Sequence, residues 1–261
     1  MPTDNHILPG QDGFTLHRSV LVHPELAVWT SQIEAQYRIL ESARKQHGPA
    51  ALISLVPAGQ RFVPTASSLS VGAVLSGENL RAIFVALLRG PAGAWIKDEL
   101  GDPVECDLDQ AWVRRQYAPR NYPPLHAPHG WHQDGALGFD FLSHRDGNFP
   151  ADALLPMVTC WVALGPCGVD APGLEIITRR FNGLLTPAQL TDERVHAGFR
   201  EEKFSRPVMR SGDALLFRGD LLHRTHVTPA MTQDRTSLEL RFFPAERLPA
   251  RLKGDRFIAP G

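Results

Sequence analysis

Apolar side chains recur every three or four positions along the segment that follows His23-Pro24. They are Leu26, Trp29, Ile33, Tyr37 and Leu40. This spacing places all of them on one face of a helix, the face that packs against a core. Proline suits the first helical turn, and Gly48-Pro49 is a typical stop signal. The pattern therefore predicts an amphipathic helix that ends just before Gly48.

Two further helices are predicted from capping signals. Ser76 can cap a helix that runs through Leu88. Thr186 can cap a third helix, because Gln189 follows three residues later and can reach back to the backbone of Thr186.

The second half of the chain shows the pattern of short strands between turns. The segments richest in strand-forming residues are 111–117, 156–165, 173–178, 213–217 and 236–243. Helices that come first and strands that come later predict an α+β, mainly β, architecture. In it the helices of the N-terminal half support a sheet or barrel.

Composition narrows the class of protein. Of the 261 residues, 43% are hydrophobic and 21% charged, which excludes a disordered or fibrous chain. No linker-like stretch divides the sequence, so residues 1–261 are expected to form one domain. The net charge of -1 argues against a nucleic-acid partner, and the apolar run between Arg81 and Arg89 is too short to span a membrane. Three cysteines without a CxxC pair and no signal-peptide pattern indicate the cytoplasm.

A candidate metal site begins in the run Trp131-His132-Gln133-Asp134-Gly135. Residues two apart in an extended segment point to the same side, so His132 and Asp134 can offer a nitrogen and an oxygen to one metal ion. A third ligand must come from a distant strand. His223 is the favoured one because it follows a Gly-Asp turn and an apolar strand, and His226 is the alternative. Two histidines and one carboxylate are the ligand set of non-haem Fe(II) oxygenases.

A row of polar side chains shares one face of the next predicted strand. These residues are Arg235, Ser237, Glu239 and Arg241. An arginine beside hydroxyl groups suits a carboxylate, because its guanidinium forms two parallel charge-assisted hydrogen bonds. Arg235 is the favoured carboxylate-binding residue. Arg241 is the alternative carboxylate-binding residue. If Arg235 binds the carboxylate, Arg241 is expected to contact the substrate or to pair with Glu239.

Arg114 and Gln116 share one face of the strand predicted at 111–117. They are expected to line the mouth of the same pocket as cosubstrate-binding residues, and an exposed polar face is the alternative.

Together these motifs resemble those of the phytanoyl-CoA dioxygenase (PhyH) family of Fe(II)- and 2-oxoglutarate-dependent oxygenases. The resemblance covers residues 111–243. It rests on WHQDG at 131–135, Gly173-Leu174, GDALLF at 212–217, His223 and Arg235. The sequence departs from the family after Gly173-Leu174, where most members have Pro-Gly-Ser-His and this chain has Glu175-Ile176-Ile177-Thr178.

The resemblance implies a double-stranded β-helix, a cupin-like jelly roll, with its core at about residues 104–243. It also implies the residues that bind Fe(II), which are His132, Asp134 and His223. Arg235 would bind the distal carboxylate of the cosubstrate 2-oxoglutarate, helped by Thr225 or Ser237. Trp161 resembles a family residue that lines the cosubstrate pocket.

The expected activity is hydroxylation of a small-molecule metabolite by O2, with release of succinate and CO2. Desaturation, cyclisation or epimerisation at the same centre is an alternative, and so is a jelly-roll protein that binds a metal or ligand without catalysis. The segment 135–156 contains glycines, charged residues and three phenylalanines, and is expected to act as a lid over the substrate.

Overall fold

The computed structural model of the chain describes residues 13–22, 24–56, 62–72, 75–107, 111–122, 128–136, 154, 156–181, 183–245 and 256–258. Its strands are β1 (Phe14–His17), β2 (Phe62–Pro64), β3 (Ser68–Gly72), β4 (Val104–Asp107), β5 (Trp112–Gln116), β6 (Val158–Ala163), β7 (Gly173–Ile177), β8 (Phe204–Ser205), β9 (Ala214–Arg218), β10 (His223–His226), β11 (Arg235–Pro244) and β12 (Arg256–Ile258). Its α-helices are α1 (Glu25–His47), α2 (Leu52–Leu55), α3 (Gly77–Arg89), α4 (Pro91–Leu100) and α6 (Asp192–Gly198). Short 3₁₀ turns cover Pro49–Ala51, Pro119–Asn121, Asp134–Ala136, Pro187–Gln189 and Glu201–Lys203.

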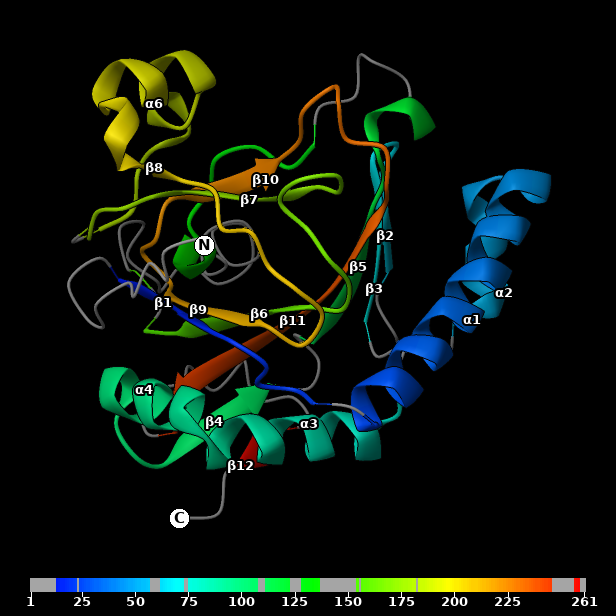
Figure 1. Cartoon of the computed structure of the whole chain (residues 1–261), viewed down its shortest axis with the longest axis horizontal. Coiled ribbons are helices and arrows are strands. Elements are labelled where there is room, and N and C mark those ends of the chain that lie inside the picture. Colours follow the sequence, from blue (N-terminus) through cyan, green and yellow to red (C-terminus); the bar gives the residue numbers. More distant parts are fainter. Residues whose placement is uncertain are drawn as a thin grey trace, which may run out of the picture.

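Two antiparallel sheets face each other across the centre of the molecule (Figure 1). The large sheet has the strand order β1-β9-β6-β11-β5-β3-β2, and β4 and β12 extend it beside β11. The small sheet has the order β10-β7-β8. From β6 onward the chain passes back and forth between the sheets: β6 lies in the large sheet, β7 and β8 in the small sheet, β9 in the large, β10 in the small and β11 in the large sheet again. This is the arrangement of a double-stranded β-helix, and it confirms the predicted mainly β jelly roll.

Helices cover the outer face and one end of the large sheet (Figure 1). Helices α3 and α4 lie beneath the sheet, where Phe84 packs edge-to-face on Phe242 of β11. Helix α1 flanks β2 and β3, and the Tyr37 hydroxyl lies 3.0 Å from the Leu69 carbonyl of β3 and 2.8 Å from the Val113 carbonyl of β5. Of the helices that the structure describes, none combines the length and apolarity needed to cross a membrane.

The first two helix predictions are confirmed. Helix α1 buries all five of the apolar residues that the periodicity selected. Helix α3 begins after Ser76, whose hydroxyl accepts a hydrogen bond from the Asn79 backbone at 3.2 Å.

The third helix prediction is wrong in its start. Thr186 and Gln189 do form a capping box, but it closes only a 3₁₀ turn. The α-helix starts at Asp192, where Thr191 accepts a hydrogen bond from the Arg194 backbone at 3.3 Å. A capping box satisfies the donors of one turn and does not specify how far a helix continues.

The two faces of β11 have different roles. Leu238, Leu240 and Phe242 belong to the helix-packed core, as the alternation predicts. The opposite face is turned toward the small sheet and carries Arg235, Ser237, Glu239 and Arg241, all buried. A sheet with one apolar and one charged face thus separates the core from the interior of the jelly roll.

Candidate active site

Two segments that are far apart in the sequence bring the candidate metal ligands together. The His132 backbone N–H donates to the His223 carbonyl at 2.9 Å, and the His223 N–H donates to the His132 carbonyl at 3.1 Å. Gly135 continues this contact by donating to the Gly219 carbonyl at 2.7 Å. A Cβ atom on Gly135 would lie 2.9 Å from that carbonyl oxygen, so the close approach of the two backbones requires glycine after the carboxylate.

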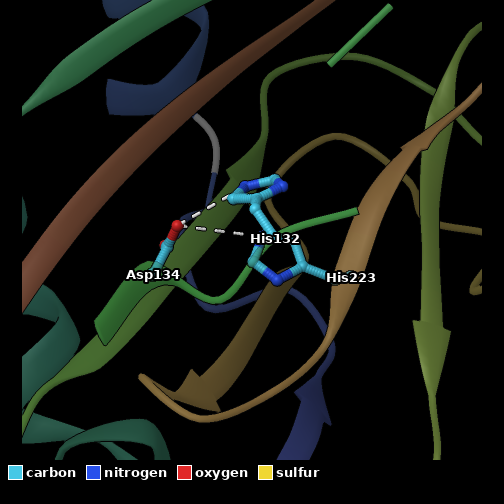
Figure 2. A group of neighbouring side chains, drawn as sticks. All are labelled: His132, Asp134 and His223. Carbon is cyan, nitrogen blue, oxygen red and sulfur yellow. Dashed lines mark ion pairs between the residues drawn. The ribbon is translucent and has the colours of Figure 1, made fainter. Parts of the chain in front are cut away.

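The Asp134 carboxylate faces both imidazole rings (Figure 2). Its Oδ1 atom lies 3.6 Å from Nε2 of His132 and 3.9 Å from Nε2 of His223. One ligand atom from each of the three residues lies within 4.8 Å of the other two. The structure therefore places the three predicted ligands where one metal ion can contact all of them.

Both imidazoles are oriented by backbone carbonyl groups. Nδ1 of His132 lies 2.7 Å from the Gly130 carbonyl, and Nδ1 of His223 lies 3.1 Å from the Leu221 carbonyl. A carbonyl oxygen only accepts, so Nδ1 of each ring carries a proton and Nε2 is the nitrogen turned toward Asp134. Such carbonyl partners fix the tautomer and ring direction of metal-binding histidines.

The second oxygen of Asp134, Oδ2, is contacted by two side chains of the large sheet. The Thr159 hydroxyl donates to Oδ2 at 2.6 Å, and Nη2 of Arg241 lies 3.5 Å from the same oxygen. Burial alone would raise the pKa of the Asp134 carboxyl. The Arg241 guanidinium, with the Thr159 hydrogen bond, instead holds this pKa well below its usual range. The carboxylate is thus ionised, and Oδ1 is the oxygen left for a metal.

The histidine next to this carboxylate is held in its neutral form. Burial, followed by repulsion from His223 and His129, lowers the pKa of His132 well below its ordinary value. A metal ligand has to be a neutral imidazole or an ionised carboxylate, so the site favours the metal-binding state of both side chains.

Strand alternation decides between the two candidate histidines of β10. His223 and Thr225 are buried on the inner face of the strand, whereas His226 is only half-buried on the other face. His226 accordingly takes no part in the group of potential ligands.

The three ligands open into a cavity of about 900 Å³ between the two sheets. Among the predicted site residues, Arg114, Trp161, Thr225 and Arg235 line it. The segment 135–156, expected to be a lid, lies largely outside the described residues.

Arg235 is a buried cation on the wall of this cavity. It is 1% exposed, and its guanidinium carbon lies 4.8 Å from the centre of the Trp161 ring. Its Nε and Nη1 atoms have no hydrogen-bond partner among the described residues. Burial lowers the pKa of Arg235 to about 10. A buried cation with unpaired donors requires an anionic partner, because burying it unpaired is costly.

Three further residues were predicted to lie around the cosubstrate: Ser237, Gln116 and Arg114. The structure places them in different positions relative to the cavity. Ser237 is fully buried on the face of β11 that carries Arg235, and its hydroxyl has no partner among the described residues. Gln116 is buried as well, but its amide donates to the Ser67 carbonyl at 2.8 Å, and it is not part of the cavity wall. Arg114 lines the cavity and forms an ion pair with Glu239.

Two residues near the metal site were not predicted to contribute. The ring of His129 lies 3.9 Å from that of His132, and burial followed by the nearby Arg114 lowers the pKa of His129 to about 4. The Gln133 amide donates to the Asp220 carbonyl at 2.8 Å and accepts from the Leu185 backbone at 2.7 Å. Alternation predicts that Gln133 points away from the metal, but no sequence signal identifies its partners.

The family model for phytanoyl-CoA dioxygenase (PhyH) matches residues 10–230. The chain belongs to the phytanoyl-CoA dioxygenase family of Fe(II)- and 2-oxoglutarate-dependent oxygenases. This confirms the family inferred from the sequence motifs. The matched region includes all three candidate metal ligands and ends before Arg235.

Solved structures support the jelly-roll fold of this phytanoyl-CoA dioxygenase family member. EctD from S. alaskensis with 2-oxoglutarate and 5-hydroxyectoine is 18% identical, with a TM-score of 0.61 over 90% of this chain and 73% of that chain. HygX from Streptomyces hygroscopicus with nickel, 2-oxoglutarate and hygromycin B is 16% identical, with a TM-score of 0.52 over 95% and 94%. The epimerase SnoN from nogalamycin biosynthesis is 16% identical, with a TM-score of 0.55 over 90% and 80%. Among curated proteins, none matches the sequence.

Proposed function

We propose that this member of the phytanoyl-CoA dioxygenase family hydroxylates a small-molecule metabolite with Fe(II), 2-oxoglutarate and O2, and releases succinate and CO2. One observation carries the proposal. The potential metal ligands His132, Asp134 and His223 converge at a cavity whose wall also holds the buried Arg235, and two nitrogens of Arg235 have no hydrogen-bond partner among the described residues. A keto acid that chelates a metal at one end and carries a carboxylate at the other requires both features together.

The donor set suits Fe(II). Two neutral imidazoles and one carboxylate are the protein ligands of non-haem iron oxygenases, and they leave coordination positions for 2-oxoglutarate and O2. When bound, Fe(II) supplies the activation of O2 that couples the oxidation of 2-oxoglutarate to that of the substrate. The protein's contribution is to hold the His132 and His223 Nε2 atoms and Asp134 Oδ1 ready before the metal binds.

Arg235 is proposed to bind the distal carboxylate of 2-oxoglutarate. Its contact with the Trp161 ring fixes the plane of the guanidinium, and its unpaired donors are available for a carboxylate. The hydroxyl of Thr225 on the cavity wall and that of Ser237 on the same face of β11 are the proposed hydrogen-bonding partners of this carboxylate.

Hydroxylation is the proposed outcome, and a rearrangement at the same centre is the second candidate. The similar structures include an epimerase and a carbocyclase as well as EctD with 5-hydroxyectoine. One jelly roll therefore hosts several outcomes, and the choice depends on which atom of the substrate lies nearest the metal.

The test is an activity screen with a mass readout. Purified protein is loaded with Fe(II) and incubated in air with 2-oxoglutarate and a panel of metabolites, and succinate is measured. A product heavier by one oxygen atom would establish hydroxylation, whereas loss of two hydrogens or an unchanged mass would establish ring closure, desaturation or epimerisation. Succinate no higher than with His132→Ala, for every metabolite, would contradict the proposal and leave a non-catalytic jelly roll.

The remaining expectations from the sequence are part of the same proposal. We propose that residues 1–261 form one domain, which acts in the cytoplasm on a small molecule without a nucleic-acid or membrane partner. The net charge of -1 supports the absence of a nucleic-acid partner.

A further inference from the structure

Arg114 projects from β5 into the same cavity as the metal ligands. In the large sheet it lies opposite Ser237 of β11 on one side and opposite Ser70 of β3 on the other. Its Nε atom is 3.1 Å from Glu239 Oε1, and its Nη2 atom is 3.3 Å from Glu239 Oε2. Only the Nη2 contact has the geometry of a hydrogen bond, and the two contacts together hold the Nε–Nη2 edge of the guanidinium against Glu239.

One edge of this guanidinium remains available to a ligand. Nη1 of Arg114 makes no hydrogen bond with any described residue, and the side chain is 21% exposed, on the wall of the cavity. Arginine has five donors in a fixed fork, so an arginine held along one edge can still bind an oxyanion along the other.

Glu239 does not neutralise Arg114 completely. Its Oε2 atom also lies 4.0 Å from Nη2 of Arg241, so one carboxylate is shared between two guanidinium groups. Glu239 and Arg241 are both buried, where charges are poorly screened by water. Asp134 balances the charge of Arg241 in turn, but it is also a candidate metal ligand. A bound divalent cation would leave this wall with excess positive charge, which an anionic group beside Arg114 would offset.

The hydroxyl-rich strand β3 completes the surroundings of Arg114. Ser70 is 6% exposed, lines the cavity, and makes no side-chain hydrogen bond with the described residues. Its hydroxyl can donate to an oxyanion that Arg114 holds.

A chain of charged groups links this position to the metal ligands. Asp134 Oδ2 lies 3.5 Å from Arg241, Arg241 lies 4.0 Å from Glu239, and Glu239 is paired with Arg114. A group bound to Arg114 is therefore held at a fixed separation from Asp134. Such an anchor determines which part of a substrate faces the metal.

From these contacts we infer that the substrate carries an oxyanion, a carboxylate or a phosphate ester, and that Arg114 and Ser70 bind it. The inference rests on the proposed function and specifies its substrate class. Arg235 serves the cosubstrate in this assignment, and Arg114 serves the substrate.

The experiment uses probe anions and Mn(II), which does not consume 2-oxoglutarate. The protein is loaded with Mn(II) and saturating 2-oxoglutarate, and the proton relaxation of benzoate, phenyl phosphate and benzamide is measured by NMR. Bound Mn(II) accelerates the relaxation of any probe held in the cavity. Benzoate or phenyl phosphate is expected to show a saturable effect at least about tenfold stronger than that of neutral benzamide. The ratio between the two anions identifies the preferred oxyanion.

Variants connect the effect to Arg114. Arg114→Gln is expected to weaken anion binding at least about tenfold while Mn(II) and 2-oxoglutarate bind as before. Arg114→Lys keeps the charge without the forked guanidinium, so its affinity for the anions should lie between those of the wild type and of Arg114→Gln. This second variant keeps the test valid if Arg114→Gln fails to fold. Arg200→Gln, at a side chain that is 88% exposed, is the matched control and should change nothing.

Three results would overturn the inference. The first is equal binding of benzoate and benzamide. The second is unchanged anion binding in Arg114→Gln and Arg114→Lys. The third is loss of the effect when 2-oxoglutarate is raised tenfold, because benzoate would then occupy the cosubstrate position. A wild-type protein that binds neither Mn(II) nor 2-oxoglutarate would instead contradict the proposed function, and the inference with it.

Discussion

Replacing Arg235 with methionine is expected to stabilise the free protein and to weaken its binding of 2-oxoglutarate strongly. The guanidinium is 1% exposed, and two of its nitrogens have no partner among the described residues. Burial lowers the pKa of Arg235 to about 10, so at every pH below about 10 the side chain is charged and this buried charge destabilises the folded state. At about 1.4 kcal/mol per pH unit, this lowered pKa corresponds to a cost of about 3 kcal/mol.

Methionine has a similar length and carries no charge, so it removes this cost and keeps an apolar contact with Trp161. Part of the gain is lost with the cation–π contact, which leaves an expected increase of about 1–3 kcal/mol in the free energy of unfolding. Binding should change in the opposite direction. Removing one partner of a buried charge pair costs about 2–5 kcal/mol, which weakens 2-oxoglutarate binding by roughly 30-fold to several thousand-fold.

Two measurements on Zn(II)-loaded protein follow this trade-off without turnover. Thermal unfolding gives the stability with and without 2-oxoglutarate, and isothermal titration calorimetry gives the affinity. Arg200→Met is the exposed control and should match the wild type in both. A methionine variant that is less stable than the wild type and binds 2-oxoglutarate equally well would show that Arg235 is a structural residue.

Three other substitutions test the metal site. His223→Ala should lower metal affinity at least about 100-fold in calorimetry, because it removes one of three ligands. His226→Ala, on the opposite face of β10, is the control and should leave metal affinity unchanged. Equal effects of the two substitutions would contradict the assignment of His223 as a ligand. Thr159→Val removes the hydrogen bond to the carboxylate ligand, so metal affinity should fall about 10- to 100-fold, and an unchanged dissociation constant would refute a role in orienting that ligand. Gly135→Ala should reduce stability in urea unfolding by about 1–3 kcal/mol, since its Cβ would meet a backbone carbonyl, and wild-type stability would show that the backbone yields.

The elements that the sequence predicts well are those whose pattern is local. Helix α1 follows from one apolar stripe and its stop signal, and β11 follows from strict alternation between Leu238 and Phe242. The helix expected at Thr186 does not follow in the same way. Its capping box is present, but Thr191 supplies a second cap five residues later, and the helix begins there.

The candidate site shows the same division between local and distant information. His132 and Asp134 are two residues apart, so their common direction can be predicted from the sequence. The position of Arg241 cannot, because it depends on the register that places Arg241 of β11 opposite Thr159 of β6. That pairing brings both side chains to Oδ2 of Asp134, the oxygen turned away from the metal position, and no single-segment pattern contains it.

The most direct test of the account is the fate of O2 in the iron-loaded protein. The protein is incubated with Fe(II), 2-oxoglutarate and ¹⁸O2, alone and with the carboxylate and phosphate metabolites that the Arg114 inference selects, and succinate is analysed by mass spectrometry. The account predicts succinate that contains one ¹⁸O atom and that forms at background level in His132→Ala. Unlabelled succinate, or equal amounts of labelled succinate from the wild type and His132→Ala, would contradict the claim that this site couples O2 to the oxidation of 2-oxoglutarate.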